Sequence, residues 1–224
     1  MPTNEQRAET IEMDEIWDFV RIKARIKDRL GRVEEAGDAW TWLAIDAKSK
    51  LVLSHAVGLR DEATCERFLT QLNSATVGPC HVTSDGLSLY TYRVPFYLGS
   101  RASFAQLVKT YSSTQTETRY SPATITGCEK TVRFGNPDES KISTSFSERL
   151  NLSLRMHCRR YTRLTNAHSK TFEHHTAMTT IFVAWYNFCR ANSTLGKKTT
   201  PAMASGLADH VWSVKELLER AAQI

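Results

Sequence analysis

The sequence contains no apolar run of about 18 residues, the length that a membrane-spanning helix needs. Its first thirty residues carry charges where a secretory signal would need an apolar stretch. These absences predict a soluble, cytoplasmic protein with no membrane partner. Neither an internal repeat nor a domain linker is present, and 41% of the 224 residues are hydrophobic. We therefore expect one large domain, with or without a small appendage.

Cysteine is also scarce, and its spacing forms no motif. The five cysteines stand at positions 65, 80, 128, 158 and 189, with no CxxC pair. Their odd number and wide separation indicate neither a disulfide framework nor a zinc ribbon. We expect reduced cysteines that serve as packing residues.

The protein is mildly basic, with 29 Lys and Arg residues against 24 Asp and Glu residues and a net charge of +5. Such an excess is compatible with a polyanionic partner but is common in proteins that never bind nucleic acid. Basic residues concentrate at 21–32 and at 149–170. The first cluster alternates with period two, which fits one face of a strand or ribbon. A solvated edge strand protected by charge is the alternative.

Hydrophobic periodicity predicts a strand-rich beginning. Residues 10–20 alternate as in a half-buried strand, with Ile11 and Met13 on the apolar face and Asp14 on the other. Residues 40–45 and 51–57 flank a polar turn and predict a hairpin. A helix is expected at 60–74, a short strand at 81–85, a short helix at 87–97 that breaks at Pro95, and a strand at 103–111.

The second half turns from polar to helical. Segments 123–126 and 130–134, inside a turn-rich region at 112–143, predict an inserted hairpin. From Ser145 onward, 100° spacing places Glu148, Arg155 and Arg159 on one stripe of a helix. The opposite stripe is apolar and is formed by Leu150, Leu154, His157, Tyr161 and Leu164. Further helices are expected at 171–190 and 213–222, the latter opening with a Ser-x-x-Glu capping box.

This order of elements suits an α/β fold of the ribonuclease-H-like type. The first three strands have no crossover helices between them, so the sheet should open with three antiparallel strands and carry helices on both faces. The expected divisions are a polar lead at 1–9, a catalytic domain at 10–190 and a C-terminal loop and helix at 191–224 packed on the core.

Three acids stand where phosphoryl transfer would need metal ligands. Two Mg²⁺ or Mn²⁺ ions require hard oxygen ligands, and Asp14, Asp85 and Glu148 come from a first strand, a later strand end and a following helix. Each also has a structural explanation: a polar strand residue, a turn former before a glycine, and the capping-box partner of a serine. Asp46 is a rival acid that its hairpin turn explains. Glu15 points to the apolar face and is not assigned.

Several blocks resemble the insertion-sequence-one-like family of bacterial DDE transposases, in that family's order. They are MDEIW at 13–17, TSDG at 83–86, GNPD at 135–138, STSFSERLNL at 143–152, RRYTRLTN at 159–166, YNF at 186–188 and TPAMASG at 200–206. The resemblance implies a ribonuclease-H-like core that nicks DNA and transfers the freed 3′ hydroxyl. It also implies two divalent ions, Mg²⁺ or Mn²⁺, held by Asp14, Asp85 and Glu148.

Candidate DNA contacts lie on and after the helix that carries Glu148. Arg155 and Arg159 share its stripe, where a guanidinium could hold a phosphate, and Asn151 is on a neighbouring stripe, where it could touch DNA or a metal-bound water. Arg149 and Arg163 complete the basic cluster. The alternative for the arginines is a solvated surface, and His157 is expected to pack against apolar residues.

The resemblance implies double-stranded DNA, as element ends and target, as the partner of a nucleoid-associated protein that forms a homodimer or a higher assembly. Related full-length transposases carry a zinc-binding and helical DNA-recognition region before the first acid, whereas thirteen residues precede Asp14 here. A truncated or separately encoded catalytic portion, with a separate recognition protein, is therefore expected. The alternatives are a nuclease without strand transfer and an inactive DNA-binding or regulatory remnant.

Overall fold

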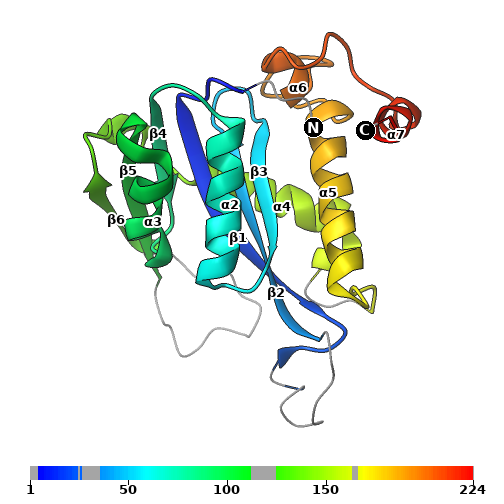
Figure 1. Ribbon diagram of the computed structural model, residues 1–224, viewed down its shortest axis with the longest axis horizontal. Coiled ribbons are helices and arrows are strands. Elements are labelled where there is room, and N and C mark those ends of the chain that lie inside the picture. The colour runs from blue at the N-terminus through cyan, green and yellow to red at the C-terminus, as the bar shows by residue number, and fades with distance from the viewer. Residues whose placement is uncertain (1–4, 25, 27–35, 112–124, 163–165, 224) are drawn as a thin grey trace.

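The computed structural model describes residues 5–24, 26, 36–111, 125–162 and 166–223. They form a six-stranded sheet in the order β3-β2-β1-β4-β5-β6 (Figure 1). The first three strands are antiparallel, β4 and β5 run parallel to β1, and β6 is antiparallel to β5. The strands are β1 (Thr10–Val20), β2 (Gly37–Asp46), β3 (Val52–Gly58), β4 (Cys80–Ser84), β5 (Ala102–Tyr111) and β6 (Ile125–Phe134).

Helices cover both faces of the sheet. In Figure 1, α2 (Glu62–Ala75) and α3 (Leu89–Leu98) lie in front of the sheet, and α4 (Ser145–His157) lies behind it. α5 (Phe172–Phe188) packs beside β3, and α6 (Pro201–Ala204) and α7 (Val214–Ala221) follow. Single 3-10 turns occur at η1 (Gly99–Arg101), η2 (Glu139–Lys141) and η3 (Arg159–Tyr161). The ribonuclease-H-like α/β fold predicted from the order of elements is confirmed.

Two apolar cores hold these layers together, one on each face. Trp42, Phe68 and Tyr90 belong to the core between the sheet and α2 and α3. Leu43, Leu150 and Phe182 belong to the core between the sheet and α4 and α5. Because helices cover both faces, β1 is buried on both sides, and the prediction that this strand is half-buried was wrong.

Two local predictions in the middle of the chain also need correction. α3 continues through Pro95, because proline removes only one helical hydrogen bond while the buried side of the helix, with Tyr90, Val94 and Leu98, packs in the core. The two strand-like pieces after residue 122 are not an inserted hairpin. β6 is one continuous strand that pairs with β5, and two register shifts accommodate its irregular pattern. Residues 112–124 lie outside the described part of the chain.

The helix that begins at Ser145 ends earlier than its periodicity suggested. Cys158 adopts an extended backbone after His157, and a 3-10 turn at η3 brings Tyr161 into the core. The Tyr161 hydroxyl bonds the hydroxyls of Thr41 (2.7 Å) and Thr179 (2.5 Å). Arg159 is therefore not on the stripe of Glu148, and Leu164 lies outside the described residues. His157 is exposed rather than packed in the core, with its ring 5.1 Å from that of Trp185.

The C-terminal segment docks on the end of α5. Trp212 stacks on Phe188, with ring centroids 4.2 Å apart, and the backbone N–H of Trp212 donates to the Phe188 carbonyl at 3.0 Å. Of the two hydrogen bonds of the capping box predicted at Ser213, the one to the helix backbone is confirmed, since the Ser213 hydroxyl accepts from the Glu216 N–H. The division of the chain at residues 9 and 190 stays a prediction. No helix of the described residues is long and apolar enough to span a membrane.

Cysteine usage follows the expectation only in part. All five cysteines are free thiols. Cys65, Cys80 and Cys158 are buried packing residues, whereas Cys128 is exposed on β6.

Candidate active site

The sheet register brings two of the predicted acids together. β1 and β4 are parallel neighbours in which Met13 pairs with Ser84. The next residue of each segment is an aspartate, so Asp14 lies in the middle of β1 beside Asp85, which directly follows β4. Such a strand end is the usual place for a site in a sheet with parallel strands, since the backbone turns away and leaves room for a ligand.

Asp14 is held by hydrogen bonds and surrounded by like charge. The Asn151 amide of α4 donates to its Oδ2 at 2.7 Å, and the Glu15 N–H donates to its Oδ1 at 2.9 Å. Burial raises the pKa of Asp14 to about 7, and the charges of Asp85 and Glu148 raise it further than burial alone would. A carboxylate in this state gains free energy from any cation that binds beside it.

Glu15, which sequence reasoning had set aside, belongs to the same cluster. Ligand oxygens of Asp14, Glu15 and Asp85 all lie within 4.8 Å of one another, a spacing that one metal ion could bridge. The Glu15 side chain is fully buried and pairs with Arg60 at 3.0 Å. Burial and the charge of Asp85 raise its pKa to about 8. A side-chain hydrogen bond with Tyr90 and the charge of Arg60 act in the opposite direction and lower this pKa.

Glu148 stands at the edge of this cluster. It lies in the first turn of α4, pairs with Lys109 of β5, and accepts from the Thr144 hydroxyl at 2.7 Å. Thr144, not Ser145, is the N-cap residue, so the proposed capping box from Ser145 to Glu148 is absent. Glu148 is outside the group of three close acids, but its charge acts on Asp14 across the gap between α4 and β1.

Hydrogen bonds hold the backbone around Asp85 in place, while its carboxylate remains accessible. Its Oδ1 accepts from the Leu87 N–H at 3.0 Å, which is the turn role expected before Gly86. The buried Gln106 amide donates to the carbonyls of Asp85 (2.8 Å) and Leu87 (2.9 Å). Oδ2 lies 3.5 Å from the Arg60 guanidinium. The turn role and a ligand role are therefore compatible in one side chain.

Residues 9–114, just under half of the chain, match the family model described as IS1 transposase. Both Asp14 and Asp85 lie within this segment. Through this segment the chain is similar to the IS1-like transposase family. The family resemblance inferred from the sequence blocks is confirmed.

Individual relatives agree with the family assignment over part of the chain. The insertion element iso-IS1n protein InsB of Shigella dysenteriae is 33% identical over 84 residues, which cover 38% of this chain and 53% of that protein. The match thus spans about half of the relative's length. Endonuclease V of Bacillus subtilis aligns over 77% of this chain and 81% of its own, with 15% identity and a TM-score of 0.30, too low to support an argument.

The candidate DNA-binding residues of this IS1-like chain are dispersed. Arg149 is exposed on α4, and Arg159 is exposed in η3. Arg155 lies about 10 Å along the helix axis from Glu148 and donates to the Tyr161 carbonyl at 3.0 Å. Burial raises the pKa of Asp18 to about 7, and the charge of Arg155 opposes this shift. Asn151 faces Asp14. Arg163 lies outside the described residues, as do four of the six basic residues of the first cluster.

Sequence reasoning missed the cations that flank the acids. Arg60 stacks over the ring of Trp40 at 4.8 Å while it pairs with Glu15 and Asp85, and Lys109 pairs with Glu148. No sequence motif marks either residue as a site residue. Each lies near the acids only because of the strand order and the direction of the preceding loop. Asp46, in contrast, accepts from the Ser49 N–H at 2.7 Å, so the turn explanation of this rival acid is confirmed.

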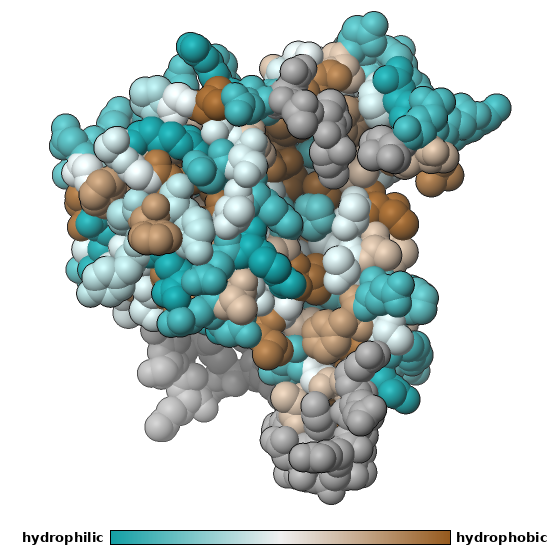
Figure 2. Space-filling view, viewed as in Figure 1, coloured by the Kyte–Doolittle hydropathy of each residue, from teal (hydrophilic) through white to brown (hydrophobic). Residues whose placement is uncertain are grey.

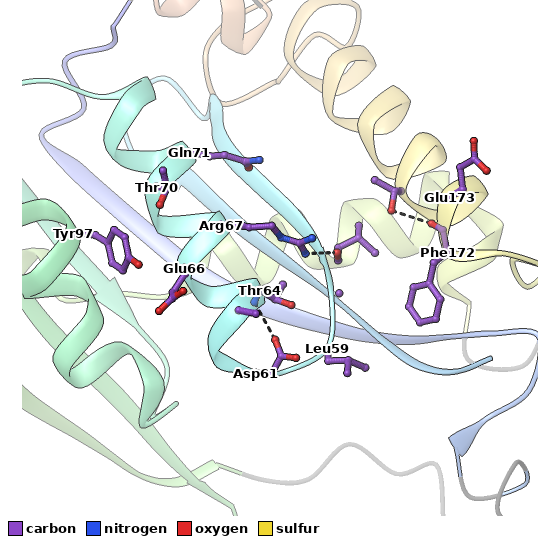
Figure 3. Close-up of a pocket in the computed structure, with 14 residues that line it drawn as sticks. Leu59, Asp61, Thr64, Glu66, Arg67, Thr70, Gln71, Tyr97, Phe172 and Glu173 are labelled. Atoms are coloured by element: carbon purple, nitrogen blue, oxygen red, sulfur yellow. Dashed lines mark hydrogen bonds between the residues drawn. The ribbon is translucent and has the colours of Figure 1, made fainter. Parts of the chain in front are cut away.

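Hollows between α2 and α5 form no part of the acidic cluster. One, of about 990 Å³, is lined by Asp61, Arg67, Tyr97 and Phe172, and Figure 3 shows it between the start of α2 and the start of α5. The other, of about 760 Å³, runs along β3, and Figure 2 shows apolar residues in the furrow between the two helices. None of the predicted site residues lines either hollow.

Proposed function

We propose that this chain is the catalytic portion of a DDE-type transposase, which nicks DNA and joins the freed 3′ hydroxyl to a target phosphodiester. The observation that carries the proposal is the convergence of Asp14 and Asp85, from neighbouring parallel strands, with a third carboxylate on the helix that crosses them. The similarity of residues 9–114 to the IS1 transposase family supports the same reaction.

The cluster fits divalent cations with oxygen ligands. Asp14, Asp85 and Glu148 would hold them, as the family resemblance implies, and Glu15 is close enough to contribute an oxygen. Burial and the charge of neighbouring carboxylates raise the pKa values of Asp14 and Glu15, so a divalent cation bound beside them would favour their ionised forms. Such ions would supply Lewis-acid activation of the attacking hydroxyl and charge stabilisation of the leaving oxygen.

The protein's own cations would meet the substrate. Arg60 pairs with Glu15 and Asp85, Lys109 pairs with Glu148, and Arg149 is exposed one residue after Glu148. Double-stranded DNA, as element end and target, is the substrate that this mixture of acids and bases suits, because the cations can neutralise phosphates that flank the reacting one. Assembly into a homodimer or larger complex, a separate DNA-recognition protein, and a cytoplasmic, nucleoid-associated location belong to the same proposal.

A plasmid assay tests the chemistry. The purified chain should nick supercoiled plasmid in Mn²⁺ or Mg²⁺ and should not do so in EDTA. Asp85→Asn should lower the nicking rate by at least about a thousandfold, since it removes a ligand from charge stabilisation of the transition state. Glu219→Gln, an exposed acid of α7 that pairs with Lys215, serves as the control and should retain full activity.

A second substrate separates the proposal from its alternatives. A radiolabelled duplex with a pre-cleaved 3′ end should become joined to plasmid target. Metal-dependent nicking without joined product would identify a nuclease instead. DNA binding with neither product, and with no difference between wild type and Asp85→Asn, would identify an inactive remnant.

A further inference from the structure

Helix α4 receives little capping from the side chains at its own start, since the Ser143 hydroxyl accepts from only one of its backbone N–H groups, that of Ser145, at 3.1 Å. Its N-cap residue, Thr144, makes no capping hydrogen bond and instead directs its hydroxyl to Glu148. The first N–H groups of a helix have no partner within it and carry partial positive charge, so they require an acceptor from elsewhere. For α4 that acceptor comes from a strand far away in sequence.

The acceptor is Glu12 of β1. Its Oε2 accepts from the backbone N–H of Phe146 at 2.7 Å and from that of Ser147 at 3.0 Å. Glu12 is 1% exposed, and a carboxylate so deeply buried persists only when hydrogen bonds and charge compensate for lost water. The helix N-terminus supplies both.

A cation completes this contact. Lys50, from the turn between β2 and β3, is buried, and its ammonium lies over the Phe146 ring, 3.1 Å from the centroid. Lys50 and Glu12 therefore hold the first turn of α4 from two sides, through one side-chain ring and two backbone amides.

One turn further along, the Asn151 amide donates to Asp14. Since Glu12 and Asp14 are two residues apart in β1, their side chains project from the same face of the strand. β1 thus binds α4 at residues 146 and 147 and again at residue 151. Glu148 lies between these two attachments.

We propose that Glu12 is a positioning residue of the active site, which sets the place of Glu148 relative to Asp14 by capping α4 from β1. This inference rests on the proposed function, in which Glu148 contributes to metal binding. The role differs from that of a ligand, because both hydrogen bonds of the Glu12 Oε2 go to the helix backbone and not into the acidic cluster.

The test uses the whole chain and two readouts, Mn²⁺ affinity by calorimetry and amide hydrogen exchange at residues 146 and 147. Glu12→Ala should weaken Mn²⁺ binding about ten- to hundredfold, as loss of an outer partner of a metal ligand does, and should expose both amides to exchange. Glu12→Gln, whose amide oxygen can still accept, should recover much of both. Glu12→Asp, which is one methylene shorter, should recover less and replaces Glu12→Ala if that variant fails to fold.

Thr171→Ala is the matched control, because Thr171 caps α5 by accepting from the His174 N–H at 3.1 Å. It should lower stability and leave Mn²⁺ affinity unchanged. The proposal is overturned if Glu12→Ala binds Mn²⁺ as wild type does, or if Thr171→Ala weakens binding equally. A wild-type chain that binds no Mn²⁺ would instead refute the proposed function itself, and the positioning role would fall with it.

Discussion

Asp14 and Glu15 are adjacent in sequence and project from opposite faces of β1, yet their carboxylates crowd the same site. Alternation separates side chains across a sheet, but near the end of β4 both can turn toward the gap beside Asp85. The result is a set of acids whose mutual repulsion and burial raise the pKa values of two members. The protonation of Asp14 and Glu15 therefore determines the net charge of the site.

The pH dependence of stability follows from these two groups. In the unfolded chain their pKa values are about 4, whereas in the folded protein they are about 7 and about 8. The folded state keeps protons that the unfolded state has lost, so this stabilisation is complete below about pH 4, falls as pH rises between about 4 and 8, and is absent above about pH 8. His175, whose pKa burial lowers to about 4, acts in the opposite direction below about pH 6.5.

The metal-free protein should accordingly lose about 2–3 kcal/mol of unfolding free energy between pH 6.5 and 8.5. Urea unfolding at several pH values in EDTA measures this. Asp14→Asn, which cannot ionise, should reduce the slope. A flat profile for the wild type would contradict the raised pKa values.

Gln106 offers a second residue-scale prediction, because its amide is the donor for two carbonyls in the loop of Asp85. Gln106→Met should cost about 1–3 kcal/mol of unfolding free energy by leaving buried carbonyls unpaired. It should also weaken Mn²⁺ binding, since the loop then loses its anchor. Urea unfolding and calorimetry measure the two effects.

The control for Gln106 is Arg133→Met, which removes the exposed guanidinium that donates to the Gln106 Oε1 at 2.8 Å and leaves both loop bonds in place. This variant should change both quantities much less. Equal losses in the two variants would argue against a specific role for the loop bonds.

At the scale of elements, contacts with the rest of the protein decide where a helix stops. α4 ends at His157 although its apolar periodicity continues, because η3 places Tyr161 between α5 and β2. α3 shows the reverse, since packing carries it past a proline. In both cases burial outweighs local preference.

Tyr161→Phe tests the anchor of η3. The tyrosine hydroxyl bonds two threonines in the buried core, so its loss should lower the free energy of unfolding by about 1–2 kcal/mol. Tyr92→Phe, at an exposed position of α3, should change it by less than about 0.5 kcal/mol. Thermal or urea unfolding compares the two, and similar values would refute the anchoring role.

At the scale of the whole molecule, the active site joins the two halves of the sheet and the helix behind it. Asp14, Asp85 and Glu148 come from β1, the end of β4 and α4, so a bound ion would cross-link separate layers. Folding and metal binding should therefore be thermodynamically linked.

Saturating Mn²⁺, at about 100 times its dissociation constant, should add about 2.7 kcal/mol to the unfolding free energy. For a chain of this size the midpoint of thermal unfolding should rise by about 5–10 °C. Asp85→Asn should show little or no rise. Differential scanning calorimetry with and without EDTA measures it, and an unchanged wild-type midpoint would speak against the metal site.

The sequence by itself determined the order of strands and helices along the chain, the two-sided α/β fold, and the places of Asp14 in the first strand and Asp85 at the end of a later one. These features follow from local periodicity and from the rule that strands without crossover helices pair as antiparallel neighbours. The family blocks added Glu148. Alternation also placed Glu12 on the face of Asp14, although nothing local indicated what it would cap.

Only the tertiary structure decided which side chains meet. Arg60, Lys109 and Gln106 reach the acids from α2's leading loop and from β5, which pairs with β4 but follows it by a helix in the chain. Hydrogen-bond partners 134 and 135 residues apart join Glu12 to α4. Such contacts depend on strand order, register and where helices end, and burial free energy summed over the whole core sets these, not any local pattern.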